Sequence, residues 1–329
     1  MVIQKKGMDG IMTDRRYLPE GMLYGSEQNT YWTADLRRLE RAMEQGQILE
    51  GMAVRCDCAN MCLTVDMGCV QGVIPREEAL YLRQGDEAKD IAIITRVGKP
   101  VAFKITDIDL SGEVPRAILS RRAAQEECAE KSISHLTPGD VIPATVTHLE
   151  PFGAFVDIGC GIVSLLTVDS ISVSRISHPQ DRFRCGDKIF CVVKSIDSEN
   201  GRIYMTHREL LGTWEENAAA FSVGETVTGI VRSIEEYGIF VELAPNLAGL
   251  AEYRDGIAVG DRCAVFIKSM IPDRMKIKLV LIDSISSGFA GAEPNDKRQK
   301  YYIDTERTHH IDRWQYSPDN CAKVIESVF

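Results

Sequence analysis

The stretch AFVDI at 154–158 decides the fold, because it alternates apolar residues with an aromatic ring and an acid. In a strand, its first, third and fifth residues share one face, and Phe155 shares the opposite face with Asp157. The same pattern recurs in IFVEL at 239–243, where Phe240 again stands two residues before a carboxylate. A large ring repeated on the polar face of a strand predicts two copies of one kind of unit, with a function on that face.

An aromatic residue and a glycine stand directly before each strand, as Phe152–Gly153 and Tyr237–Gly238. The glycine is expected at the bend that joins the strand to the one before it. The closing strand of the first unit, RIYMT at 202–206, places Arg202 and Tyr204 outward by alternation. The outer wall of this unit is therefore expected to carry both rings and a cation.

The closing strand of the second unit, KIKL at 276–279, places Lys276 and Lys278 outward by the same alternation. Exposed rings beside basic residues on a barrel wall suit bases stacked beside a phosphate backbone. The alternative is that Phe155 and Phe240 close a barrel end or bury against a neighbouring domain. Alternation alone leaves both interpretations open.

Two segments resemble the S-one RNA-binding domain family, named after the largest protein of the bacterial small ribosomal subunit. The segment at 139–207 carries GD, FGAFVDIG, SISVSRISHP, CGD and SIDSENGRIYMTH, and the segment at 222–283 is a shortened version. The connector at 207–224 contains TWEE and resembles the linker between successive repeats in that ribosomal protein. The resemblance implies five-stranded OB-type barrels that bind single-stranded RNA.

The resemblance also implies which residues contact RNA. The expected contacts are Phe152, Phe155, Thr167, Asp197, Arg202 and Tyr204 on the best-preserved barrel, and Tyr237, Phe240, Lys276 and Lys278 on the next. Thr167 stands where many family members carry a histidine, and a threonine can hydrogen-bond a base or phosphate but cannot stack on it. The next barrel has a shortened connection between its third and fourth strands, so we expect weaker binding there.

Residues 47–122 resemble a divergent copy of the same repeat. Thr64 takes the place of the stacking ring, and Met61 takes the place of the aromatic before the glycine. Because Thr64 offers no ring to a base, we expect this copy to serve docking or protein contact.

The fold class expected is all-β, with three tandem five-stranded OB-fold barrels joined by short helical connectors. The segments expected are a lead-in with a docking helix at 1–46, barrels at 47–122, 137–211 and 222–283, and a linker with a C-terminal hairpin tail at 284–329. Apolar spacing predicts a helix at 34–45 capped by Thr33, and composition predicts a helical connector at 123–136 and a linker at 284–298. The β-prone runs at 301–303 and 311–316 predict the hairpin.

Composition is that of an ordinary globular protein, with 44% hydrophobic and 26% charged residues among 329. No run approaches a membrane helix and the N-terminus lacks a signal-peptide layout, so we expect a cytoplasmic protein without a membrane partner. The net charge of −10 argues against a protein that coats duplexes through basic patches. A stacking platform needs fewer cations, so single-stranded RNA remains the expected partner.

No metal, cofactor or catalytic site is expected. Four of the ten cysteines cluster at Cys56, Cys58, Cys62 and Cys69, but their spacing is not the paired C-x2-C of zinc ribbons, so free thiols are favoured. The sequence also lacks a phosphate loop, a dinucleotide fingerprint, a G-x-S-x-G elbow and an H-E-x-x-H helix. These observations predict a protein that is not an enzyme.

Two functions are consistent with the sequence. The first is a single-stranded RNA-binding protein, holding messenger RNA in association with the small ribosomal subunit during translation. The second is an adaptor that recruits an RNA-processing or transcription complex through barrels acting as protein-contact modules. Co-sedimentation with ribosomal particles, before and after nuclease treatment, would separate the two.

Overall fold

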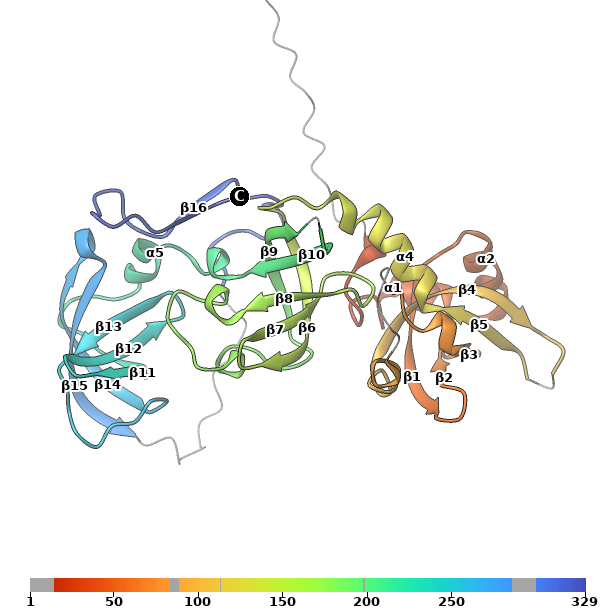
Figure 1. The fold of residues 1–329 in the computed structure, drawn as a ribbon, viewed down its shortest axis with the longest axis horizontal. Helices are drawn as coiled ribbons and strands as arrows, with labels where there is room; N and C mark the ends of the chain where they lie inside the picture. Colours follow the sequence, from red (N-terminus) through yellow and green to blue (C-terminus); the bar gives the residue numbers. More distant parts are fainter. Residues whose placement is uncertain (1–14, 83–88, 113, 198, 286–299) are drawn as a thin grey trace, which may run out of the picture. The chain divides into compact units, whose positions relative to one another are not determined.

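The computed structural model describes residues 15–82, 89–112, 114–197, 199–285 and 300–329 (Figure 1). Within these residues the strands close into three barrels of five strands each. The expected all-β fold of three tandem barrels with short helices is therefore confirmed.

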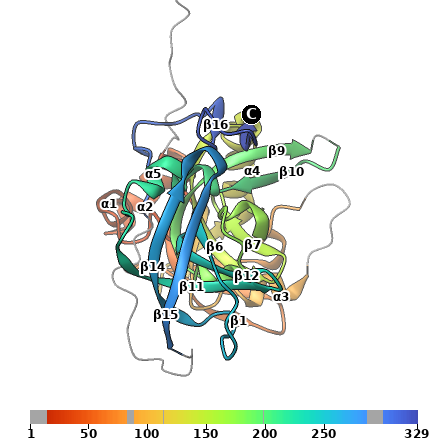
Figure 2. The same cartoon turned by 90° about the vertical axis from the view of Figure 1, so that its left-hand side faces the viewer.

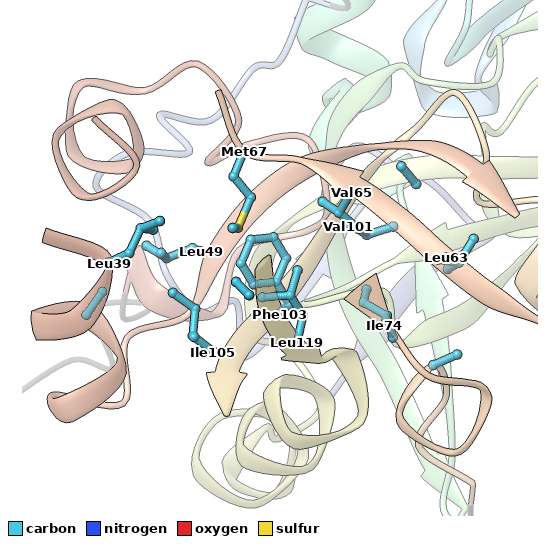
Figure 3. Close-up of a cluster of buried hydrophobic side chains, with 14 of the residues drawn as sticks. Leu39, Leu49, Leu63, Val65, Met67, Ile74, Val101, Phe103, Ile105 and Leu119 are labelled. Carbon is cyan, nitrogen blue, oxygen red and sulfur yellow. The ribbon is translucent and has the colours of Figure 1, made fainter. Parts of the chain in front are cut away.

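The first barrel has the strand order β1-β2-β3-β5-β4. Its strands are β1 (Leu49–Asp57), β2 (Cys62–Asp66), β3 (Gln71–Ile74), β4 (Pro100–Asp109) and β5 (Arg116–Ser120). The pairing of β3 with β5 is parallel and the other recorded pairs are antiparallel. Figure 3 shows its core, in which Phe103 of β4 lies among inward side chains such as Leu49, Val65 and Leu119.

The second and third barrels have the same circular strand order. The second consists of β6 (Val141–Glu150), β7 (Gly153–Asp157), β8 (Val163–Thr167), β9 (Lys188–Asp197) and β10 (Arg202–Thr206). The third, seen from its own side in Figure 2, consists of β11 (Thr226–Glu235), β12 (Gly238–Ala244), β13 (Leu247–Ala251), β14 (Arg262–Ile271) and β15 (Lys276–Ile285). Of the apolar residues that alternation placed inward, those that are buried are Ala154, Val156, Ile158, Ile239 and Val241. Leu243, which alternation also placed inward, is only partly buried against the core of the third barrel.

Five short α-helices connect and flank the barrels in the described part of the chain: α1 (Glu27–Trp32), α2 (Leu36–Glu44), α3 (Asp90–Ile94), α4 (Arg121–Lys131) and α5 (Trp214–Ala218). The expected cap Thr33 was wrong, because Asp35 caps α2 by accepting the Arg38 N–H (2.9 Å). Thr33 instead ends α1, a helix that the irregular composition of the lead-in had hidden.

The remaining connections contain short 3-10 helices. They are η1 (Arg15–Tyr17), η2 (Arg76–Glu78), η3 (Ile133–His135), η4 (Val168–Ser170), η5 (Pro179–Asp181), η6 (Arg208–Leu211) and η7 (Pro272–Arg274). The connector between the second and third barrels thus runs through η6 and α5. In α5, Thr213 and Glu216 form a reciprocal capping box, and Trp214 is buried in the core of the third barrel. The TWEE motif therefore both starts a helix and anchors it.

The C-terminal hairpin exists, but one of its strands differs from the prediction. β16 (Arg313–Gln315) pairs with β17 (Glu326–Val328), and not with the run at 301–303. Trp314 and Tyr316 are buried in the core cluster of the third barrel, so the tail packs on that barrel as expected. The predicted linker at 284–298 lies outside the described residues from 286 onward, and its first two residues end β15.

Internal contacts divide the chain into two compact units. One holds the described residues up to Leu136 together with Pro143–Thr145 and Val156–Ser164. The other holds Thr137–Ile142, Val146–Phe155 and Leu165–Phe329. The ring-bearing residues of the second and third barrels therefore belong to one unit, which we call unit 2, and the first barrel belongs to unit 1.

Candidate nucleic-acid interface

The two rings of the second barrel meet edge to face on its outer wall. Phe152, at the turn between β6 and β7, is 54% exposed, and Phe155 on β7 is half-buried. Their centroids lie 5.9 Å apart with an interplanar angle of 89°, which is the preferred geometry of an aromatic pair. The interpretation that Phe155 buries in a barrel end does not describe this arrangement, because the ring stays partly open to solvent beside an exposed partner.

Gly153 brings the neighbouring strand close to these rings. A Cβ at this position would lie 2.6 Å from the carbonyl oxygen of Leu166 and 3.1 Å from the Cα of Thr167, so no side chain fits. The glycine is required by close strand approach, where the sequence had suggested only a flexible bend. The Val168 N–H also donates to the Phe152 carbonyl (3.0 Å), which places Thr167 beside Phe152.

Two further expected contacts of this barrel, Arg202 and Tyr204, lie on β10. Tyr204 is level with Leu165 in the parallel pair of β10 and β8. Arg202, two residues earlier on the same face, lies toward one end of the wall, and Thr167, two residues after Leu165, lies toward the other. The structure thus places Phe152, Phe155 and Thr167 together and sets Arg202 apart from them.

Asp197 shapes a turn at the Arg202 end. It faces Arg202 in the register of β9 and β10. Its carboxylate accepts the Glu199 N–H (3.0 Å), the Asn200 N–H (3.3 Å) and the Asn200 side-chain amide (2.9 Å). Hydrogen bonds from Asn200, first its side chain and then its backbone, lower the pKa of Asp197. This carboxylate is therefore already engaged in holding the hairpin between β9 and β10.

Thr167 belongs to a polar cluster at its own end of the wall. Its hydroxyl shares a hydrogen bond with Ser170 (3.0 Å), and Lys194 Nζ donates to the same Ser170 hydroxyl (2.9 Å). A hydrogen bond from Thr167 and the charge of Lys194, 4.0 Å away, lower the pKa of Asp169. Lys194 thus places a partly exposed cation beside Thr167. Lys194 was absent from the residues expected from sequence. Alternation could have placed it on the outer face, because it follows the inward residue Val193.

The third barrel repeats the ring pair and carries two lysines on the same wall. Tyr237 is 69% exposed, and its ring lies 6.2 Å from Phe240 at 89°. Phe240 pairs with Leu250, which in turn pairs with Lys278. Lys276 is exposed on the same face of β15. All four expected residues of this barrel therefore lie on one wall, with Lys278 in the place that Tyr204 holds in the second barrel.

The first barrel has no ring at the equivalent positions. Thr64 pairs with Val73, which pairs with Ile118, and Arg55 faces Thr64 from the other side. Thr64, Val73 and Ile118, all with branched side chains, thus occupy the positions that Phe240, Leu250 and Lys278 occupy in the third barrel. This agrees with the expectation that Thr64 offers nothing on which a base can stack.

The carboxylates that follow the rings are buried, although the sequence had placed them on the polar face. In unit 2, Glu242 accepts from Arg182 (2.6 Å) and Arg232 (2.7 Å), and Arg232 also pairs with Asp181 (3.0 Å). Asp181 ends η5 of the second barrel and Arg182 follows it, so this ion-pair cluster ties the second barrel to β11 and β12 of the third.

A second tie within unit 2 centres on Asn246, whose side chain is fully buried between β12 and β13. Its oxygen accepts the Val173 N–H (2.9 Å), and its amide donates to the carbonyls of Arg208 and Gly212 (both 2.8 Å). The Tyr316 hydroxyl donates to the Asn246 carbonyl (2.6 Å). One residue therefore fastens the second barrel, the connector and the C-terminal tail to the third barrel.

Unit 1 holds a separate cluster of buried acids. The Asp157 carboxylate accepts the Glu20 N–H (2.7 Å), and the Glu20 side chain pairs with Arg121 (2.7 Å). Burial, reinforced by the Glu20 charge, raises the pKa of Asp157. Glu50 accepts the backbone N–H groups of Gly21 and Tyr24, and burial raises its pKa to about 8. These acids are packed into the protein and offer no open surface to RNA.

Neither a metal cluster nor a membrane-spanning helix is found in the part of the chain that is described. The residues described there include no group of three or more His, Cys, Asp or Glu side chains placed to hold a metal ion. Among the same residues, no helix combines the length and apolar character needed to cross a bilayer. The cysteines at 56, 58, 62 and 69 are all free thiols.

Comparison with known proteins agrees with this geometry. The family model of the S1 RNA binding domain matches residues 135–208, which contain all five strands of the second barrel. The second barrel therefore matches the S1 RNA binding domain. The resemblance to the S-one family is thereby confirmed on the barrel that carries Phe152 and Phe155.

Ribosomal proteins are among the relatives that the chain resembles. The small ribosomal subunit protein bS1 of Leuconostoc lactis is 32% identical over 220 residues, which are 64% of this chain and 49% of the relative. The bS1 homologue of Bacillus cereus is 34% identical over 201 residues, or 59% of this chain and 50% of the relative. The chain thus spans about half the length of the curated relatives it matches.

Proposed function

We propose that this protein binds single-stranded RNA, messenger RNA in particular, and works with the small ribosomal subunit in translation in the cytoplasm. The observation that carries the proposal is the half-open edge-to-face pair of Phe152 and Phe155 on the S1-matched barrel. Bases of single-stranded RNA stack on such rings, whereas the bases of a duplex are already stacked and unavailable. The proposed role is binding without catalysis.

The two ring-bearing barrels support this proposal in different ways. The second offers rings with Lys194 and Arg202 at opposite ends of the wall, and the third offers a ring pair with Lys276 and Lys278 alongside. Because both barrels are held in unit 2 by the Glu242 and Asn246 contacts, their walls present a fixed pair of binding faces. We therefore assign RNA binding to unit 2 and a contact role to the first barrel.

The test is a fluorescence-anisotropy titration of the whole chain against single-stranded and duplex RNA of one sequence, joined to sedimentation with ribosomal particles. We expect binding to the single strand, poor competition by the duplex, and co-sedimentation with the small subunit. Equal affinity for single strand and duplex would contradict the stacking mechanism. Sedimentation with an RNA-processing or transcription complex, and not with ribosomal particles, would instead support the adaptor function.

A further inference from the structure

A third ring lies beside the pair on the second barrel. His148 of β6 has its ring centroid 6.2 Å from that of Phe155, and the two rings are inclined by only 29°. Phe155 therefore has two neighbouring rings, that of Phe152 edge to face and that of His148 nearly parallel. The His148 side chain is 62% exposed, so this face of the ring row is open to solvent.

One contact is made by the third ring itself, and a second joins its strand to that of Phe155. The His148 Nε2 lies 2.7 Å from a carboxylate oxygen of Glu150, which requires a hydrogen on Nε2 because an ionised carboxylate only accepts. The hydroxyl of Thr147 donates to the Phe155 carbonyl (3.1 Å), which ties β6 to β7 next to the rings. The imidazole is thus held over the barrel wall beside Phe155.

The third ring distinguishes the second barrel from the third. Ser233 faces Phe240 in the register of β11 and β12, and it precedes Phe240 by seven residues, as His148 precedes Phe155. In the first barrel the residue facing Thr64 is Arg55. Among the three barrels, a ring at this place is therefore found in the second barrel.

We propose that His148 is an RNA-contacting residue that extends the stacking platform of the second barrel by one base toward β6, with Glu150 as its positioning partner. The inference rests on the proposed RNA-binding function. An imidazole offers a flat π-face that tolerates any base, as the neighbouring phenyl rings do. The platform of the second barrel then consists of three rings, against two in the third barrel.

The experiment compares ring and non-ring substitutions at this site by anisotropy with a fluorescein-labelled single-stranded oligouridylate. His148→Ser, which copies the third barrel, should weaken binding about five-fold, the lower end of the range for one stacked base. His148→Phe restores a ring and should stay within about two-fold of the wild type. The matched control His135→Ser removes an exposed histidine that lies outside the wall and should leave affinity unchanged.

Each outcome has a distinct meaning. Wild-type affinity in His148→Ser, with Phe155→Ala weakened in the same assay, would overturn this inference and leave the proposed function standing. Equal weakening by His148→Ser and His148→Phe would overturn the stacking role of the imidazole. A wild-type protein that does not bind the oligonucleotide would overturn both proposals. As a converse test, Ser233→His should tighten binding if a third ring in the third barrel adds a base contact, and unchanged affinity there would contradict the general role of this position.

Discussion

The first and second barrels share one strand order and differ in the row of outward side chains that crosses it. In the first, Thr64, Val73 and Ile118 form that row. In the second, Phe155 lies on the same wall as Leu165 and Tyr204, which pair across β8 and β10. The inward residues therefore specify the barrel. The outward residues can differ between barrels, with rings on which bases stack in one and branched side chains without rings in the other.

The largest expected effect is a loss of stability when the buried ion-pair cluster around Glu242 is broken. Glu242→Ala removes the shared partner of Arg182 and Arg232, whose side chains are only 8% and 9% exposed. Because Arg182 loses its carboxylate partner and Arg232 keeps only Asp181, the free energy of unfolding of the third barrel should fall by about 3 to 5 kcal/mol. Asp66→Ala, at the same strand position in the first barrel, removes an exposed side chain and should cost about 1 kcal/mol or less.

Buried thiols report these changes locally. Cys263 is buried in the third barrel and Cys128 is buried in unit 1. Thiol labelling across a urea series should show a lower midpoint for Cys263 in Glu242→Ala, with Cys128 unchanged. An unaltered Cys263 midpoint would show that the ion-pair cluster does not stabilise the third barrel.

The next largest effect is expected when the ring pair of the second barrel is replaced by the residues of the first barrel. Phe152→Met with Phe155→Thr gives the second barrel the residues that the first has at 61 and 64. RNA binding should weaken by about 2 kcal/mol or more, because two stacking rings are lost. The same exchange at Tyr237 and Phe240 should cost less, because the third barrel lacks a third ring at Ser233. Filter binding of both double variants measures the difference, and a larger loss from the third barrel would reverse our ranking of the two.

A smaller effect is that the stability of unit 1 should depend on pH through the buried carboxyl group of Glu50. Burial raises the pKa of Glu50 to about 8 from its ordinary value of 4.5, so the folded chain keeps a proton that the unfolded chain releases above that ordinary value. This contribution to stability is complete below pH 4.5 and is lost as the pH rises toward 8, by at most about 1.4 kcal/mol per pH unit. Labelling of Cys128 in urea between pH 5.5 and 8, pulsed at one common pH, should show this decline.

The control for the pH effect is Glu50→Gln, which removes the titrating group. Its Cys128 midpoint should change less with pH than that of the wild type. Parallel pH profiles for the two proteins would contradict the assignment of the decline to Glu50.

The smallest expected effect concerns salt. Few cations face the ring walls, so the logarithm of the affinity should fall gently with the logarithm of salt concentration, by about 0.7 per phosphate contact. Lys278→Ala should reduce the slope by that amount or less, and Thr64→Ala should change neither slope nor affinity. A steep slope in the wild type would show that phosphate contacts dominate over stacking.

Sequence alternation predicted the barrels because the inward set follows a strict period of two. It identified Phe155 and Phe240 for the same reason, and the TWEE motif predicted a connector. His148 escaped because the corresponding strands carry a register shift, between Val231 and Ser233 in the third barrel and between Ala53 and Arg55 in the first. Such a bulge turns the following residue to the other face, so alternation from Val146 would have pointed His148 inward.

The burial of Asp157 and Glu242 could not be read from their own strands. Each is outward by alternation, and each is covered by residues distant in sequence, Glu20 in one case and Arg182 in the other. The second strand of the tail hairpin escaped similarly, because three residues at 326–328 carry little periodic signal. Local pattern specified the barrels, and contacts between distant segments decided which parts of their walls stay open.

The central claim is that base stacking on the open ring pair of the second barrel holds RNA. The most direct test is an anisotropy titration of the wild type and Phe155→Ala with single-stranded RNA, together with a thermal melt of each protein. We predict that the variant loses about 1 to 3 kcal/mol of binding and melts close to the wild type, because the ring lies on the wall and outside the core. Equal affinities, or a collapsed melting temperature in the variant, would contradict the account.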